Sequence, residues 1–311
     1  MSAAAQKSPS YSYADCLEKS YRINWTIKDI LGDREFDASR RWLPSALSGA
    51  DRISCLNEEE RIKLTHVEMG AYSHLFGFVE EFIAPLVSAL GLEFKVDNRE
   101  AFDALTNFAA EEVKHMNLFR QIRSKVDHRI GFPLALLDGE KDVAKFVLSR
   151  NIGAGLLLTA CIEWFTQLHY TSAFQDHDNL DPLTKQIFKS HWLEESQHAR
   201  MDHLETLRAF AGMNETQRDQ AVDDLIGLVV AVDGLLQKQS QFDVENLAKY
   251  LGRSFSAAES KEIYDNVFRA KRYCFIESGV THPNFLDLFV AVTTPAQQAK
   301  VQGSLQSLLS S

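Results

Sequence analysis

The sequence predicts an all-α protein organised around a four-helix bundle, and three observations support this fold class. The chain of 311 residues contains only 7 Pro and 15 Gly, so long helices can run without interruption. From about residue 57 onward, apolar residues recur at spacings of three and four, as on the buried face of a helix. One long segment rich in helix breakers divides the periodic region into two pairs of helices. We expect residues 1–311 to form a single domain.

The residues before this region, 1–56, combine short periodic pieces with turn signals such as Gly32, Pro44 and Gly49. We expect a lead-in of loops and short helices that wraps the bundle. The four bundle helices fall within residues 57–212, and Pro85 is expected to kink the first or end it early. Their expected ranges are 57–90, 99–126, 142–174 and 182–210.

The segment between the second and third helices, 127–141, contains Gly131, Pro133 and Gly139 and cannot be helical throughout. At about 3.3 Å per residue it can span about 45 Å, more than the ~30 Å length of a 20-residue helix. It can therefore cross the whole bundle. One long crossover between helices two and three is the ferritin-like topology.

The remaining residues, 213–311, show further amphipathic periodicity and are expected to cover one end of the bundle. The segment ends in a tail of small residues for which no helix is expected. The additional helices are expected at 219–250, 257–276 and 284–292.

Composition excludes several classes of protein. With 45% hydrophobic and 24% charged residues, the chain is neither disordered nor a coiled-coil rod. A net charge of −10 argues against a nucleic-acid partner. The 4 Cys residues form no CxxC pair, which argues against a zinc ribbon or a disulfide framework. No signal peptide is visible at residues 1–15, and the longest uncharged apolar stretch, near 152–162, is shorter than the ~18 residues of a membrane span. We expect a cytoplasmic protein without a membrane partner.

Two Glu-Glu-x-x-His motifs carry the chemical signal, one on the second predicted helix and one on the fourth. They contain the only Glu-x-x-His matches in the chain, Glu112 with His115 and Glu195 with His198. Residues three apart share one helical face, so each pair can hold one metal ion.

An internal repeat strengthens this interpretation. A shift of 83 residues superposes the two motifs and also places Glu80 on Glu163. Each half then has a Glu followed 32 residues later by the Glu of a Glu-x-x-His. One Glu from each of two helices, with Glu-x-x-His from each of the other two, is the ligand pattern of dimetal sites in helical bundles.

The ligand on the first helix is either Glu80 or Glu81. Glu80 aligns with Glu163, and at 100° per residue it lies nearer the apolar face of its helix. We therefore expect Glu80, with Glu81 as the alternative.

His191 breaks the symmetry of the two halves. It lies four residues before Glu195 on the same helical face, whereas the equivalent residue in the first half is Phe108. We expect the second metal to gain an imidazole that the first lacks. The predicted ligand set, with four carboxylates and three histidines, is Glu80, Glu112, His115, Glu163, His191, Glu195 and His198, a set that suits iron or manganese.

Glu111 and Glu194, beside the predicted ligands, are open to two interpretations. They can accept hydrogen bonds from the ligand histidines and so fix their tautomers, or they can be exposed acids on the helix surface.

Each half of the repeat has a Glu, Glu80 or Glu163, followed about 30 residues later by a Glu-Glu-x-x-His motif. This pattern resembles the ferritin-like di-iron oxygenases over about residues 57–210. Within that superfamily, His191-x-x-x-Glu195-x-x-His198 resembles the p-aminobenzoate N-oxygenase family, which oxidises aryl or alkyl amines to hydroxylamine, nitroso or nitro products. Glu111 and Glu194 stand where an Asp is often found, a departure that keeps the charge.

The resemblance implies that the seven predicted ligands are also the catalytic centre. It implies a cofactor of two iron ions, with manganese as the alternative, O2 as co-substrate, and an amine as the small-molecule substrate. Because the chain has no strand-linked GxGxxG fingerprint, electrons are expected from an external donor such as a ferredoxin or a flavin reductase. Analogy with related bundles favours a homodimer.

Two other functions are compatible with the same ligands. An acyl desaturase or C–H hydroxylase is the alternative within the enzyme class, and His191 argues against it. An iron-binding or storage protein is the alternative from another class. Against storage, about 100 residues follow the fourth helix, more than a storage bundle needs.

Overall fold

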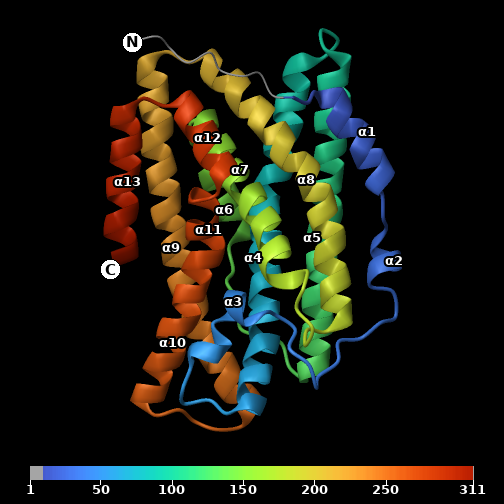
Figure 1. The fold of residues 1–311 in the computed structure, drawn as a ribbon, viewed down its shortest axis with the longest axis vertical. Coiled ribbons are helices and arrows are strands. Elements are labelled where there is room, and N and C mark those ends of the chain that lie inside the picture. Colours follow the sequence, from blue (N-terminus) through green and yellow to red (C-terminus); the bar gives the residue numbers. More distant parts are fainter. Residues whose placement is uncertain (1–9, 311) are drawn as a thin grey trace.

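Four long helices form the bundle in the computed structural model, which describes residues 10–310 (Figure 1). They form two antiparallel pairs, α4 with α5 and α7 with α8, and no strand occurs within the described range. The prediction of an all-α ferritin-like bundle is confirmed. The four helices are α4 (Glu58–Phe94), α5 (Arg99–Ile130), α7 (Ile152–His169) and α8 (Pro182–Ala211).

Side-chain caps set where these helices begin. The Asn57 side chain accepts a hydrogen bond from the backbone N–H of Glu60 at the start of α4. Asp181 does the same for Thr184 at the start of α8. Such caps satisfy backbone N–H groups that have no partner within the helix. The helix α5 ends at its C-terminus with Gly131, whose φ of 91° is the left-handed conformation that glycine adopts without strain.

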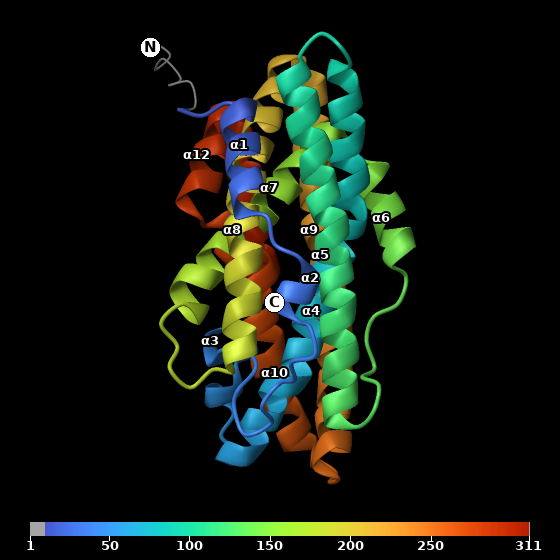
Figure 2. The same cartoon turned by 90° about the vertical axis from the view of Figure 1, so that its right-hand side faces the viewer.

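The crossover follows α5 and runs back along the outside of the bundle (Figure 2). Residues 131–139 are irregular, and the short helix α6 (Glu140–Leu148) then packs against α4. The single helix predicted over 142–174 is wrong, because the chain breaks between α6 and α7. Asn151 causes the break: its side chain accepts from Gly153 N at 2.9 Å and caps a new helix. A π-helical turn, Tyr170–Phe174, follows α7.

The helix α4 continues through Pro85 to Phe94, so the proline does not end it early. By length and composition alone α4 is apolar enough to cross a membrane, and 61% of its most apolar window is buried inside the protein. A central helix of a bundle has the same composition, because neighbours cover it on every side.

The N-terminal segment wraps the bundle, because its first two helices lie along α5 and α8 while its later elements pack against α4 and α10 (Ala257–Arg272) (Figures 1 and 2). Residues 1–9, part of the stretch searched for a signal peptide, lie outside the described residues. The segment consists of loops and short helices, as expected from its turn signals. These elements are α1 (Tyr13–Ile23), α2 (Ile27–Ile30), α3 (Ser45–Ser48) and a 3-10 turn at Ala50–Arg52.

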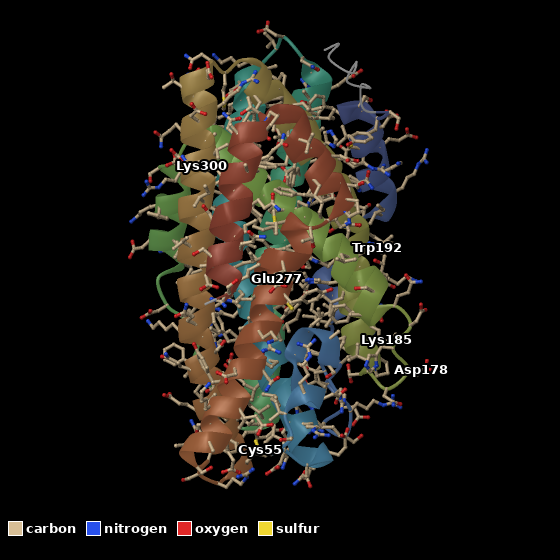
Figure 3. The ribbon with its side chains drawn as sticks, turned by 60° about the vertical axis from the view of Figure 1, so that its left-hand side comes forward. Cys55, Asp178, Lys185, Trp192, Glu277 and Lys300 are labelled. Atoms are coloured by element: carbon tan, nitrogen blue, oxygen red, sulfur yellow. The ribbon has the colours of Figure 1, made fainter. Side chains whose placement is uncertain are left out.

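The C-terminal helices cover α4 and α7 on another side of the bundle. The helix α9 packs against both, and α13 packs against α9, where Lys300 forms an ion pair with Asp223 (Figure 3). These elements are α9 (Glu215–Leu251), α10 (Ala257–Arg272), a π-helical turn at Tyr273–Glu277, α11 (Ser278–Val280), α12 (Pro283–Val292) and α13 (Pro295–Ser310).

The expected non-helical C-terminal tail is the helix α13. Thr294 and Gln297 cap its start, since each backbone N–H donates to the other's side chain. Val301, Leu305 and Leu308 recur at helical spacing and pack against the hydrophobic core. The prediction failed because these three apolar residues are scattered among Ser and Gln.

The contact of α11 with α7 offers a test of the packing around the centre of the bundle. A Cβ added at Gly279 would lie 2.7 Å from the carbonyl oxygen of Cys161. We expect Gly279→Ala to lower the free energy of unfolding by about 1–3 kcal/mol, because backbone must shift to admit the methyl group. Urea denaturation measures this change.

Gly234→Ala is the matched control, since a Cβ there has nothing within 4 Å and Gly234 lies inside α9. We expect it to be neutral or to stabilise by up to about 1 kcal/mol, from the higher helix propensity of alanine. Equal effects of the two substitutions would contradict the close approach of α11 to α7.

Candidate metal centre

Four buried glutamates gather inside the bundle, one from each of its long helices. Each lies on the helical face that also carries the core residues, so helix packing draws it into the interior. They are only 1 to 3% exposed: Glu80 on α4, Glu112 on α5, Glu163 on α7 and Glu195 on α8. An ionised carboxylate is costly to bury unless it is paired or binds a metal. This concentration of acids therefore requires positive charge.

The glutamates and three fully buried histidines form two overlapping clusters of ligand atoms. Within each cluster the ligand atoms lie within 4.8 Å of one another. The first cluster is Glu80, His115, His191 and Glu195, and the second is Glu112, His115, Glu195 and His198. Because His115 and Glu195 belong to both, the two candidate metal positions are adjacent.

Glu195 occupies the centre of the arrangement. Its Oε1 lies 2.5 Å from His191 Nε2 and 3.2 Å from His115 Nδ1. Its Oε2 lies 2.6 Å from His198 Nδ1. A carboxylate with one oxygen toward each side is placed to bridge two metal ions.

Glu163 belongs to neither cluster, although it was predicted as a ligand. It lies buried beside Glu195, and its Oε2 has no hydrogen-bond partner among the described residues. Burial raises the pKa of Glu163 well above its usual range, and the charges of Glu195 and Glu112 add to this effect. The structure thus brings six of the seven predicted ligands into the clusters and places the seventh at their edge.

Unpartnered polar atoms show that the residues present fit metal ions. A buried polar atom without a hydrogen bond is costly. Within residues 10–310, many of the atoms in this situation belong to the predicted ligands. The atoms that form no hydrogen bond of good geometry include both oxygens of Glu80 and Glu112, Nδ1 of His115, and both ring nitrogens of His191, although His191 Nε2 lies close to Glu195 Oε1. Oxygen and imidazole donors in this number suit first-row transition metals such as iron and manganese.

Burial and close pairing between carboxylates and imidazoles shift the pKa values of the cluster. Burial opposes the ionisation of Glu195, but the neighbouring imidazoles outweigh it and hold its pKa well below the usual range. Burial lowers the pKa of His191, which favours its neutral ring. Burial also opposes the charging of His115 and His198, but the charge of Glu195 outweighs it and holds their pKa values well above the usual range.

Glu111 and Glu194 are buried acceptors that orient the ligand histidines. His198 Nε2 lies 2.9 Å from Glu111 Oε2, and His115 Nε2 lies 2.8 Å from Glu194 Oε2. In both rings Nδ1 is left to face the metal positions. Each acid reaches the histidine of the other half, so the two halves support each other. The interpretation as exposed surface acids is wrong.

Glu80, and not Glu81, faces the centre. Glu81 points outward, where its carboxylate is 28% exposed and accepts from Arg120 at 2.7 Å. The alternative ligand is therefore used in a surface ion pair.

His191 lies with the first half-site, which corrects the expectation that it would serve the second metal. It packs against the ring of His115 with centroids 4.5 Å apart, and its Nε2 lies 3.6 Å from Glu80 Oε1. His191 and His198 stand one turn before and one turn after Glu195, so they reach opposite sides of it. The repeat contains this information, because Phe108, the equivalent of His191, stacks on His198 of the other half at 3.9 Å.

Sequence reasoning missed the part played by the N-terminal segment. Ser20 donates to Glu111, and Trp25 stacks over His115 with ring centroids 5.9 Å apart. Lys114 lies 4.1 Å above the Trp25 ring and pairs with Glu194. No local motif marks Ser20 or Trp25, because each acts across about 90 residues of chain.

The orienting acids can be tested by substitution. We expect Glu194→Gln to weaken metal binding by about 10–100-fold, because the amide cannot form a charge-assisted hydrogen bond with His115. An anaerobic titration with Co(II) against a competing chelator measures the affinity. Glu81→Gln is the matched control and should leave it unchanged, since Glu81 lies outside the centre. Equal affinities of wild type and Glu194→Gln would contradict the orienting role.

Searches of solved structures and of curated proteins gave the following comparisons. The structure resembles two variants of an R2-like ligand-binding oxidase, one described with an aerobically reconstituted Mn/Fe cofactor and one with an Fe/Fe cofactor. The first is 17% identical with a TM-score of 0.42, covering 85% of this chain and 94% of that one. The second is 17% identical with a TM-score of 0.41, covering 85% and 93%. No match was found among curated proteins.

The sequence itself matches a family over most of the chain, including the whole four-helix bundle. Residues 8–269 fit the family model described as p-aminobenzoate N-oxygenase AurF. This range contains all of the clustered glutamates and histidines and the N-terminal segment that supports them. The chain therefore belongs to the p-aminobenzoate N-oxygenase family, and it is an oxidoreductase, an oxygenase built around a buried dimetal site.

Proposed function

We propose that this chain uses two iron ions and O2 to oxidise the nitrogen of an amine to a hydroxylamine, nitroso or nitro product. The observation that carries the proposal is the pair of clusters sharing His115 and Glu195, in a chain of the N-oxygenase family. Manganese is the alternative metal, since the donor atoms suit both.

The two clusters assign the ligands to two metal positions. Glu80, His115 and His191 would hold one metal, His198 and Glu112 the other, and Glu195 would lie between them. Bound there, the metal pair would supply the redox chemistry that activates O2. Glu111 and Glu194 keep the Nε2 protons of the histidines in place while the charge of the centre changes.

Aromatic rings around the cluster exclude water from the reaction. Phe76 and Phe119 pack against His191, with ring centroids 5.5 and 5.0 Å away, and Phe108 covers His198. A dry site protects reactive species from side reactions with water. Each oxygenation places one atom of O2 on nitrogen and reduces the other to water, which consumes two electrons and two protons.

The electrons would come from outside the chain, from a ferredoxin, a flavin reductase or a similar donor. A reducing compartment such as the cytoplasm fits the cysteines Cys16, Cys55, Cys161 and Cys274, none of which forms a disulfide.

Metal stoichiometry tests the site. We expect anaerobic Fe(II) titration of the metal-free chain to saturate at about two irons, since the clusters provide two adjacent positions. Glu195→Ala should lose both irons because both clusters contain Glu195. His191→Ala should keep the iron at the position formed by Glu112 and His198. Two tightly bound irons in Glu195→Ala would contradict the ligand assignment.

Turnover tests the reaction. We expect the iron-loaded protein, given a chemical reductant and O2, to convert arylamines to N-oxygenated products that mass spectrometry identifies. Products oxygenated only at carbon would favour the hydroxylase alternative. Uptake of iron far beyond two per chain, without turnover, would favour storage.

A further inference from the structure

An apolar cavity, partly open to solvent at its rim, lies beside the metal ligands, between α4, α6, α7 and α9. Its volume is about 340 Å³, within the ~300–1,000 Å³ range of small-molecule pockets. Five of its lining residues are phenylalanines: Phe78, Phe82, Phe146, Phe165 and Phe275. The one ionisable residue in the lining is Asp142, whose side chain is 87% exposed at the rim. The interior therefore offers no charge and almost no polar atom.

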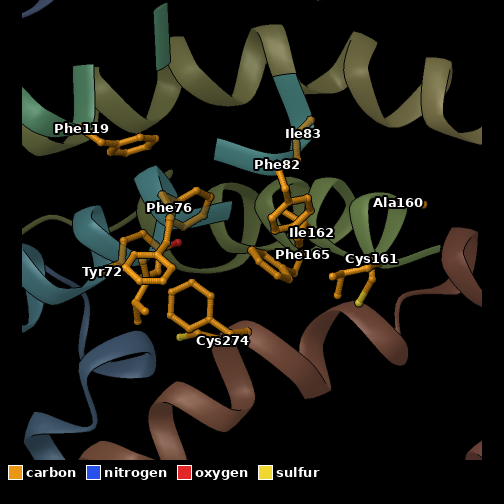
Figure 4. Packing of buried hydrophobic residues seen from close by; sticks show 14 of the residues in the cluster. Tyr72, Phe76, Phe82, Ile83, Phe119, Ala160, Cys161, Ile162, Phe165 and Cys274 are labelled. Carbon is orange, nitrogen blue, oxygen red and sulfur yellow. The ribbon is translucent and has the colours of Figure 1, made fainter. Parts of the chain in front are cut away.

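The internal repeat contributes equivalent residues of α4 and α7 to this cavity. Its lining contains three pairs of residues 83 positions apart, the offset that relates Glu80 to Glu163. The pairs are Leu75 with Leu158, Val79 with Ile162, and Phe82 with Phe165. Figure 4 shows Phe82, Ile162 and Phe165 pointing toward one another from α4 and α7. The helices α4 and α7 thus contribute equivalent residues to one part of the lining, and most of the other lining residues belong to α6 and α9.

Only a thin wall separates the cavity from the ligands. Val79 and Ile162, in the lining, directly precede Glu80 and Glu163. Phe165, also in the lining, contacts Phe76 with ring centroids 5.9 Å apart, and Phe76 in turn contacts His191. Along this path two rings, Phe165 and Phe76, stand between a bound molecule and His191.

Two other cavities do not share this position. A larger one, of about 640 Å³, lies under α12 and α13 and is lined by no residue of α4. A small polar one, of about 150 Å³, contains Arg120 and Arg123 but no residue of α7. Neither therefore lies between the two halves of the repeat.

The chemistry of the walls selects the substrate. A carboxylate in this cavity would lose its hydration and find no cation, which costs several kcal/mol. An alkylamine carries the same penalty because it is protonated at neutral pH. An arylamine is uncharged there, since its nitrogen lone pair is delocalised into the ring, and its ring can pack edge-to-face with the phenylalanines.

We propose that this cavity is the substrate site and binds an arylamine with uncharged, apolar ring substituents, and that it excludes aminobenzoates. The proposal rests on the proposed function for the reaction at nitrogen. The volume suits one substituted ring, since an apolar cavity of about 150 Å³ already holds benzene.

Binding without O2 tests the cavity separately from turnover. Isothermal calorimetry under anaerobic conditions would compare 4-butylaniline with 4-aminobenzoate on the iron-loaded full chain. We expect 4-butylaniline to bind more tightly by about tenfold or more, a difference of about 1.4 kcal/mol or more. Tighter binding of 4-aminobenzoate would overturn the proposal.

Two tryptophan substitutions on α9 locate the bound ring. Val232→Trp fills this cavity and should weaken 4-butylaniline binding by about tenfold or more, while Val230→Trp, in the lining of the larger cavity, should change it less than about twofold. A larger loss of binding in Val230→Trp than in Val232→Trp would place the site in the larger cavity and overturn the proposal.

Because Val232→Trp could disturb folding, Val143→Lys at the rim gives a second test. It should strengthen 4-aminobenzoate binding, and no change would count against the apolar selection.

Admission of O2 and reductant then separates the two proposals. If 4-butylaniline binds as expected but its nitrogen is not oxidised, the proposed function fails and the cavity assignment stands. If arylamines are oxidised while Val232→Trp leaves their KM unchanged, the cavity assignment fails and the proposed function stands.

Discussion

The central constraint on this structure is the burial of four carboxylates in one bundle, held around the Glu195 side chain. Metal ions and imidazoles can balance that charge only if the helices bring all the donors to one level. Glu80 and Glu163 come from α4 and α7, and the Glu-x-x-His pairs come from α5 and α8. The crossover after α5 is required by this geometry, because it lets the second pair of helices repeat the arrangement of the first.

The need to balance charge extends outward from the ligands. Glu111 and Glu194 add two more buried acids, and these are supported by Ser20 and Lys114. Trp25 in turn lies against both Lys114 and His115. The N-terminal segment, which resembles a simple lead-in by its turn signals, thus completes the polar surroundings of the centre. Removal of the N-terminal segment would therefore leave buried carboxylates without partners, in addition to exposing the surface of the bundle.

Sequence patterns predicted the parts of the structure that depend on local periodicity. Helical spacing of apolar residues predicted the bundle. The repeat, with its two Glu-x-x-His pairs, predicted that Glu195 and His198 lie close to Glu112 and His115. Features that depend on contacts between residues far apart in the sequence could not be predicted in this way. The break at Asn151 depends on its own cap and on Asp224 of α9, and α10 is fixed by the buried group Lys271, Glu68 and Asp243. Such pairings leave no periodic signal, since each partner comes from a different helix.

The repeat also explains where the two metal positions differ. The helices α4 and α7 contribute matched residues to the cavity, such as Phe82 and Phe165. The ligands break this symmetry, since His191 adds a neutral imidazole to one position while its counterpart Phe108 only stacks beside the other. The difference between the two positions therefore traces to one change within the repeat, a histidine where the first half has a phenylalanine.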